Sequence, residues 1–129
     1  MTADTVEASN DKMIREFLAA WERRDTQHIL DRFTDDAVYH SIPLEPIVGK
    51  AAIREFVQGF ADVPPGRLEI HHQIAGPHVV MNERTDYITL NGNPVTLPIC
   101  GVFEIADGRI KAWREYFDLS PAKAAYGTA

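Results

Sequence analysis

The second half of the chain alternates apolar and polar residues, and this period of two constrains the fold more than any other feature. Such alternation is typical of β-strands that bury one face. The short stretches "NGNP" at 91–94 and "ADGR" at 106–109 are typical of hairpin turns. Pro98 has no N–H for a strand ladder, which indicates an edge position or a bulge around it. The sequence therefore predicts an antiparallel sheet of four strands: Leu68–Ile74, Val79–Leu90, Val95–Ile105 and Ile110–Phe117.

The first half instead spaces its apolar residues three and four positions apart, as on one face of a helix. A helix is predicted to begin near Asp11, with Ser9 or Asn10 as its N-cap. Its apolar stripe consists of Met13, Ile14, Phe17, Leu18 and Trp21. The other elements expected before residue 67 are a short helix capped by Thr26, a turn followed by a short strand Ala37–His40, and a helix from Gly49 with Ile53, Phe56, Val57 and Phe60 on one face.

The order of these elements predicts the fold class. A chain of 129 residues suits one domain, so we expect a single domain over residues 1–129 with an ordered fold from about 9 to 125. A last short helix, Pro121–Ala125, is expected after Ser120. Helices, a strand, another helix and then antiparallel strands predict an α+β fold, in which a curved sheet wraps around a pocket that the N-terminal helices close.

Composition and charge exclude several classes of protein. The net charge of -6 argues against a nucleic-acid or anionic-membrane surface, because both require clustered lysine and arginine. No apolar run approaches the length of a membrane span, and the N-terminus has no signal-peptide core, so a cytoplasmic protein is expected. The single cysteine, Cys100, lies in the apolar run "LPICGVF" and is expected to be a buried packing thiol.

Charged residues occupy strand positions that should be buried. Residues two apart on a strand share a face, so Arg84 and Asp86 point the same way as Ile88. On the last strand Glu115 shares its face with Trp113 and Phe117, whose large apolar side chains favour burial.

If both faces line one pocket, two carboxylates and a guanidinium meet in an apolar cavity. Burial and mutual repulsion raise the pKa of a carboxyl, whereas an arginine between two of them lowers it. Two carboxyls with different pKa values can serve as a general acid and a general base. The alternative is a solvated strand face on which Arg84 and Asp86 form a weak ion pair.

Several segments of the chain resemble those of known families. The segment "GKAAIREFV" and the element order are similar to the cone-shaped fold of nuclear transport factor 2 and the ketosteroid isomerases, with a mixed, mainly antiparallel sheet. More narrowly, "NERTDYITL" followed by "ICGVFEIADGRIKAWREYFDL" resembles the limonene-1,2-epoxide hydrolases. That resemblance implies that Asp86 protonates an epoxide oxygen, that Arg84 bridges the two acids and that Tyr39 helps hold the attacking water.

Two positions depart from that family's pattern. Glu115 stands where the family has an aspartate base, and Ser41 stands where it has an asparagine that holds the water. The glutamate carries its carboxylate about 1.5 Å further from the backbone. A serine hydroxyl has less reach than an amide, so a longer base and a shorter water holder can compensate for each other. The expected substrate pocket consists of Trp113, Phe117, Ile88, Leu97 and Ile99.

The histidines do not suggest a metal site. His71 and His72 are adjacent on a strand and are expected to face opposite ways, and the other three have no ligand spacing. No metal and no cofactor are therefore expected.

Three functions remain open from the sequence. The first is hydrolysis of a small apolar epoxide, with a homodimer implied by the resemblance. The second is an isomerase or other proton-transfer enzyme on the same fold. The third is a small-ligand binder without catalysis, which the trio Arg84, Asp86 and Glu115 disfavours because an apolar binder gains nothing by burying charges.

Overall fold

The computed structural model describes residues 5–126, which form one six-stranded sheet and four helices. The elements are α1 (Val6–Glu22), α2 (Thr26–Asp31), β1 (Phe33–Ser41), β2 (Ile47–Val48), α3 (Lys50–Gly59), β3 (Arg67–Ala75), β4 (Val79–Leu90), β5 (Asn93–Ala106), β6 (Arg109–Tyr116) and α4 (Ser120–Ala125). The α+β class is confirmed, and the four later strands agree with their predicted ranges to within two residues at each end.

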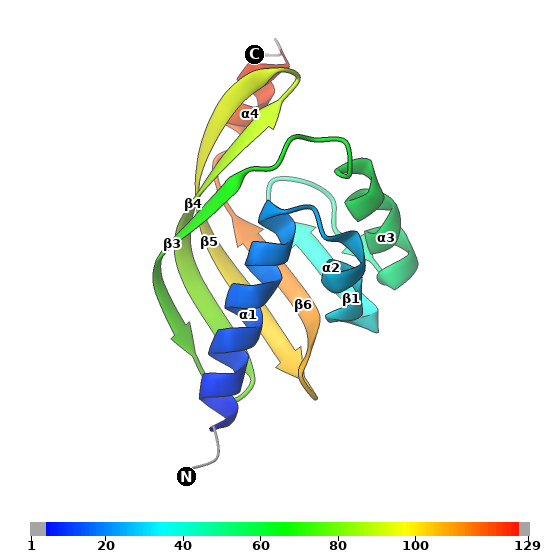
Figure 1. The fold of residues 1–129 in the computed structure, drawn as a ribbon, viewed down its shortest axis with the longest axis vertical. Coiled ribbons are helices and arrows are strands. Elements are labelled where there is room, and N and C mark those ends of the chain that lie inside the picture. The colour runs from blue at the N-terminus through cyan, green and yellow to red at the C-terminus, as the bar shows by residue number, and fades with distance from the viewer. Residues whose placement is uncertain (1–4, 127–129) are drawn as a thin grey trace.

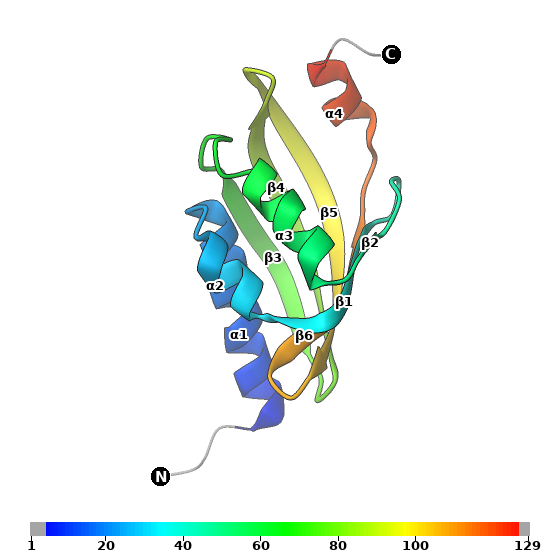
Figure 2. The same cartoon turned by 90° about the vertical axis from the view of Figure 1, so that its right-hand side faces the viewer.

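The sheet has the strand order β2-β1-β6-β5-β4-β3. Neighbours are antiparallel except β1 and β6, which are parallel, so the sheet is mixed but mainly antiparallel. The long strands β4 and β5 bend along their length, and α1, α2 and α3 lie on the concave side of the sheet (Figure 1). In the perpendicular view α4 lies beside the far end of the β4–β5 hairpin (Figure 2).

The core lies between the helices and the concave face. The aromatic rings of α1 and the sheet pack edge-to-face or stacked, with Phe17 of α1 against Phe33, Phe103 and Trp113 at centroid distances of 5.1–6.3 Å. Such ring pairs stabilise a core beyond the burial of their area. A second, smaller apolar cluster joins β5 to α4 through Val95, Leu97, Ile99 and Ala125. The pocket described below lies beside this core, between the helices and the concave face of the sheet.

The helix starts differ from the predicted caps. Helix α1 begins at Val6 and is capped by Thr5, whose hydroxyl accepts from the N–H of Ala8 at 3.0 Å. Asn10 is instead buried inside the helix, where its amide donates to the carbonyls of Gly76 and Pro77 at 3.0 and 3.2 Å. Asn10, one of the two predicted N-caps, therefore makes a tertiary contact instead of capping the helix.

The two shorter helices also start one residue before the prediction. Asp25, rather than Thr26, caps α2, with its carboxylate accepting from the N–H of His28 at 3.2 Å. Helix α4 includes Ser120 and has Leu119 at its N-cap position. The predicted start of α3 is confirmed, with Gly49 as N-cap at φ 90°, a conformation that favours glycine.

The start of β1 and the position of Pro98 test two further predictions. The predicted turn before Ala37 is wrong, because β1 runs from Phe33 through it with an irregular register against β6. Pro98 lies on the central strand β5, but β6 pairs with β5 only as far as Cys100. Pro98 therefore pairs with β4 alone and occupies a local edge, as expected.

Two predicted orientations are wrong. Cys100 is exposed, because its neighbours Ile99 and Gly101 take the buried face of β5. His71 and His72 share the outer face, because a register shift in β3 between Ile70 and His72 lets both follow the same side. His71 contacts the Thr85 hydroxyl at 2.7 Å.

In the part of the chain from 5 to 126, no helix is both long enough and apolar enough to cross a membrane. Within the same range, no three histidine, cysteine or acidic side chains come close enough together to hold a metal ion.

Candidate active site

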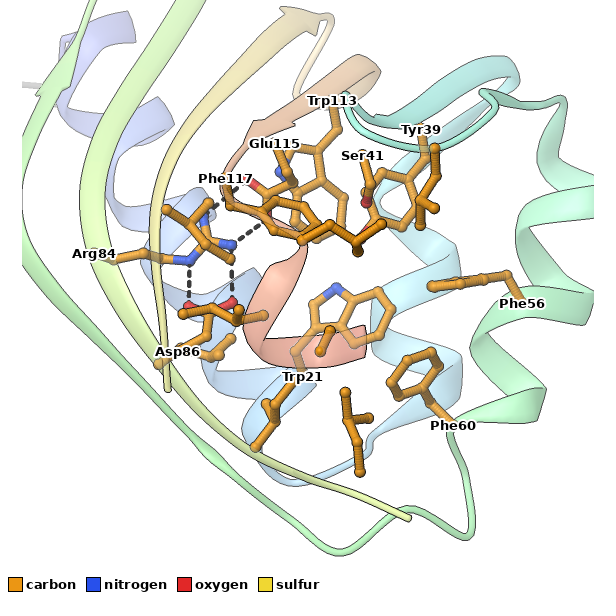
Figure 3. A pocket seen from close by; sticks show the side chains of 18 of the residues that line it. Trp21, Tyr39, Ser41, Phe56, Phe60, Arg84, Asp86, Trp113, Glu115 and Phe117 are labelled. Atoms are coloured by element: carbon orange, nitrogen blue, oxygen red, sulfur yellow. Dashed lines mark hydrogen bonds and ion pairs between the residues drawn. The ribbon is translucent and has the colours of Figure 1, made fainter. Parts of the chain in front are cut away.

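A cavity of about 220 Å³ lies between the concave face of the sheet and helices α1 and α3. All ten residues that the sequence predicted for the site line it: Tyr39, Ser41, Arg84, Asp86, Ile88, Leu97, Ile99, Trp113, Glu115 and Phe117. The side chains around it are mostly apolar, and the charged group lies at one side (Figure 3). An apolar cavity with a few convergent polar groups is typical of a small-molecule site.

Arg84 occupies the centre of the charged group. It is 2% exposed, and its Nε and Nη2 donate to the two carboxylate oxygens of Asp86 at 2.8 and 3.2 Å. On its other side, Nη1 donates to Oε2 of Glu115 at 3.1 Å and Nη2 contacts Oε1. The guanidinium therefore lies between the two acids, as Figure 3 shows. The Arg84–Asp86 pair is buried, so the alternative of a solvated strand face is wrong.

Strand alternation and register explain how these three side chains meet. Arg84 and Asp86 share the concave face of β4, and Glu115 lies on the same face of β6. Between them runs β5, whose Gly101 pairs with Asn82 on one side and Glu115 on the other. A Cβ atom at residue 101 would lie 2.6 Å from Oε2 of Glu115 and 2.8 Å from Nη1 of Arg84. The glycine therefore leaves the space through which the arginine reaches across the strand.

Burial perturbs the ionisation of both acids. It raises the pKa of Asp86, and the neighbouring Arg84 lowers it in part. It also raises the pKa of Glu115, against the lowering by Arg84, while the Asp86 charge raises it further. Burial works against the charge of Arg84, but the two carboxylates raise the pKa of the guanidinium above its ordinary value. The arginine thus stays charged, and burial makes it harder to ionise both acids at once.

Tyr39 and Ser41 lie next to Glu115. The β1–β6 pairing places Ser41 directly beside Glu115, and Tyr39 directly beside Trp113. The Tyr39 ring stacks on Trp113 with centroids 4.3 Å apart and an angle of 12°. Burial and then the Glu115 charge raise the pKa of the Tyr39 hydroxyl, which keeps its proton. Two neutral hydroxyl groups therefore flank the carboxylate, and both can bind a water molecule.

Asn82 belongs to the site as well, although the sequence analysis did not single it out. It is 3% exposed, and its Oδ1 accepts from Nη1 of Arg84 at 3.2 Å. Its amide donates to Gln73 at 3.0 Å, and Gln73 donates to Asp11 of α1 at 2.8 Å. The alternation that put Arg84 and Asp86 on one face also puts Asn82 there. The sequence therefore carried this signal, but an uncharged polar residue on a strand does not by itself indicate a functional site.

The remaining wall of the cavity comes from neighbours of the predicted residues and from helices that are far from them in the sequence. These lining residues, not predicted for the site, are Trp21, Arg24, Leu44, Phe56, Phe60, Leu68, Leu90, Leu119 and Ala122. Trp21, Phe56 and Phe60 face the charged group from the helical side (Figure 3). The sequence predicted them only as apolar helix faces, because periodicity does not distinguish a core contact from a cavity wall.

The match to a family of known proteins covers almost the whole described chain. Residues 8–124 match the limonene-1,2-epoxide hydrolase catalytic domain. The chain belongs to this family. Epoxide hydrolase EphG of Mycobacterium tuberculosis is 31% identical to it over 106 residues, which cover 82% of this chain and 71% of EphG.

One solved structure supports the same family assignment, and a second one shows the fold alone. A limonene-epoxide-hydrolase-like epoxide hydrolase of M. tuberculosis superposes with a TM-score of 0.81 at 29% identity, covering 91% of this chain and 88% of the other. A putative isomerase from Bacillus subtilis superposes with a TM-score of 0.82 at 20% identity, covering 98% of each chain, which shows a shared fold. The nuclear transport factor 2-like fold is thereby confirmed, and the family supports hydrolysis of an epoxide.

Proposed function

We propose that this protein adds water to a small apolar epoxide in one step, by general acid and general base catalysis. The observation that carries the proposal is Arg84 between two buried acids, Asp86 and Glu115, in a mostly apolar cavity. An apolar cavity without chemistry to perform would gain nothing from burying three ionisable groups. Membership of the limonene-1,2-epoxide hydrolase family supports the choice of an epoxide.

In the proposed reaction Glu115 is the base. It removes a proton from a water molecule held by Tyr39 and Ser41, and the water oxygen forms a bond to one epoxide carbon. The bond from that carbon to the ring oxygen breaks, and the oxygen takes the proton of Asp86. The product is a diol, and the proton left on Glu115 returns to Asp86 before the next turnover.

Arg84 contributes by holding both acids in place and by balancing their charge. Two guanidinium N–H groups donate to Asp86 and two to Glu115, so the acids lie on either side of the guanidinium. The substrate would then lie with its epoxide between acid and base, and with its carbon skeleton against the apolar wall. A cavity of about 220 Å³ suits a small substrate, because pockets for drug-sized ligands measure about 300–1,000 Å³.

The two departures from the family's pattern fit together in this mechanism. Ser41 and Glu115 are register partners on β1 and β6, so both contact the same small region. The longer Glu115 side chain moves the water toward β1, and the shorter Ser41 side chain leaves room for it there. The water can then keep its contacts with both groups. We propose that Glu115 and Ser41 preserve hydrolysis as a pair.

A single-turnover experiment in ¹⁸O-labelled water tests this function. Enzyme in excess over each member of a panel of small cyclic and aliphatic epoxides should give a diol that carries the label from the first turnover. A first-turnover diol whose new oxygen is unlabelled would show a covalent ester and contradict direct attack. No turnover of any epoxide, together with deuterium exchange into an enolisable ketone, would favour a proton-transfer enzyme.

We also propose a homodimer that forms through the outer face of the sheet. Apolar side chains are exposed there, with Met81 48% and Tyr116 45% exposed, and the family resemblance implies a dimer. Light scattering after size-exclusion chromatography should give twice the mass of the 14.5 kDa chain. The mass of a single chain at micromolar concentration would contradict this proposal.

A further inference from the structure

The buried pair poses a question that Arg84 does not answer: which acid carries the proton. Two guanidinium nitrogens contact Asp86 and two contact Glu115. The arginine therefore favours the ionised form of both acids, whereas burial disfavours it for both and more completely for Glu115, whose pKa the Asp86 charge raises further. For Asp86 to act as the acid and Glu115 as the base, further groups have to favour the proton on Asp86.

Two neighbours differ between the acids. The indole N–H of Trp113 is buried on the side of Glu115, where it lowers the pKa of that carboxyl. A third carboxylate, that of Glu22, lies on the side of Asp86 and raises the pKa of Asp86. An indole N–H favours a negative charge nearby, whereas a second carboxylate disfavours it.

Glu22 is held in place by the backbone of the sheet. It is the last residue of α1, and its Oε2 accepts a hydrogen bond from the N–H of Leu68 at 2.8 Å. Leu68 lies on β3, the outermost strand on that side, and is the register partner of Asp86 on β4. An edge strand has free N–H groups, so a helix carboxylate can be anchored there at a fixed distance from Asp86.

We propose that Glu22 is a positioning residue for the acid: anchored on the backbone opposite Asp86, its negative charge directs the shared proton of the pair to Asp86 rather than to Glu115. The inference rests on the proposed function only in naming Asp86 as the acid that uses this proton. Glu22 does not line the cavity, so it acts on the reaction through Asp86 and not by contact with a substrate.

The surroundings of Asp86 contain both signs of charge. The titratable and charged groups that face it or line the same cavity are Arg84 of β4, Glu115 of β6, Tyr39 of β1, Glu22 of α1 and Arg24 after α1. The Arg24 guanidinium donates to the carbonyls of Trp21, Val63 and Pro64, which hold it at the α1 corner. Glu22 is thus the group that adds negative charge from the helical side.

The variant Glu22→Gln separates the charge from the hydrogen bond. Glutamine keeps an oxygen for the Leu68 N–H and removes the negative charge. The titration of Asp86, followed by ¹³C NMR of its side-chain carboxyl in the full chain, should move to lower pH by about half a unit. The alkaline limb of kcat/KM against pH should move by the same amount. Glu16→Gln, on the same helix but on its exposed side, is the matched control and should move neither.

The outcomes separate this inference from the proposed function. A Glu22→Gln variant with a lower melting temperature but an unchanged Asp86 titration would give Glu22 a structural role only and overturn the inference. Because the NMR titration needs no substrate, a downward shift would support the role of Glu22 even if no epoxide were hydrolysed. Turnover of epoxides with an unshifted titration would leave the function intact and remove Glu22 from it.

Discussion

Replacing Gly101 by alanine should damage the site more than the fold. A Cβ at this position would lie 2.6 Å from Oε2 of Glu115, 2.8 Å from Nη1 of Arg84 and 3.1 Å from Oδ1 of Asn82. Ordinary van der Waals contact begins at 3.4 Å, so the Glu115 carboxylate has to retreat by about 0.8 Å. Glu115 and Arg84 are 3% and 2% exposed and hold each other, which leaves them little room to adjust.

A displacement of this size is large for catalysis. A misplacement of about 1 Å can cost on the order of 100-fold in rate, so we expect kcat/KM of Gly101→Ala to fall by about that factor. Overpacking a buried site costs typically about 1–3 kcal/mol in the free energy of unfolding. The variant should therefore fold while losing most of its activity. Steady-state hydrolysis of an epoxide and urea unfolding of the same preparation measure the two effects.

A second glycine provides the control. Gly59 ends α3, has no positive φ, and a Cβ there would meet no atom within 4 Å. Gly59→Ala should keep full activity and stability close to that of the parent chain. A Gly101→Ala variant with undiminished kcat/KM would show that the acids tolerate displacement, and would refute the argument that this glycine holds their geometry.

The remaining predictions concern the acids. Glu115→Gln keeps the shape of the base but accepts no proton, so turnover should fall by on the order of 100-fold or more; full activity would exclude Glu115 as base. Glu115→Asp alone should not raise activity, whereas Glu115→Asp with Ser41→Asn should recover more than the two single changes predict, because both groups contact one water; additive kinetics would end the compensation idea. Burial raises the pKa of Asp86 and Glu115, so the pair keeps its proton to higher pH than free carboxyls do. Hydrolysis should therefore fall as pH rises through the pKa of the acid, and fall again as pH drops and the base becomes protonated; a rate that is flat from acidic to strongly basic pH would remove Asp86 as donor.

The sequence predicted the charged group because alternation is a local property. Arg84 and Asp86 share a face whatever the partner strand is, and the large neighbours of Glu115 indicated that its face is buried. That the two faces meet around one arginine depends on β5 lying between β4 and β6, which the two hairpin turns already indicated. The sequence was therefore sufficient to predict which strand residues face the cavity.

The residues that the sequence did not single out act through contacts between distant segments. The role of Gly101 follows from its register against both Asn82 and Glu115, and that of Glu22 from a hydrogen bond across 46 positions of the chain. The shared outer face of His71 and His72 depends on one extra residue in β3, which reverses the alternation after it. Periodicity carries no information on such registers.

The arrangement of the strands also explains why the two departures from the family's pattern occur together. Ser41 and Glu115 are partners on neighbouring strands, so a change in the length of one alters the space around the other. Asp86 lies across β5 from Glu115 and is tied to Arg84 on its own strand. A longer base therefore leaves the acid and the arginine in place, provided that Gly101 keeps the path between them open. Residues 41 and 115 can therefore be substituted together without moving the acid. A substitution of Arg84, Asp86 or Gly101, in contrast, disturbs the position of the other two.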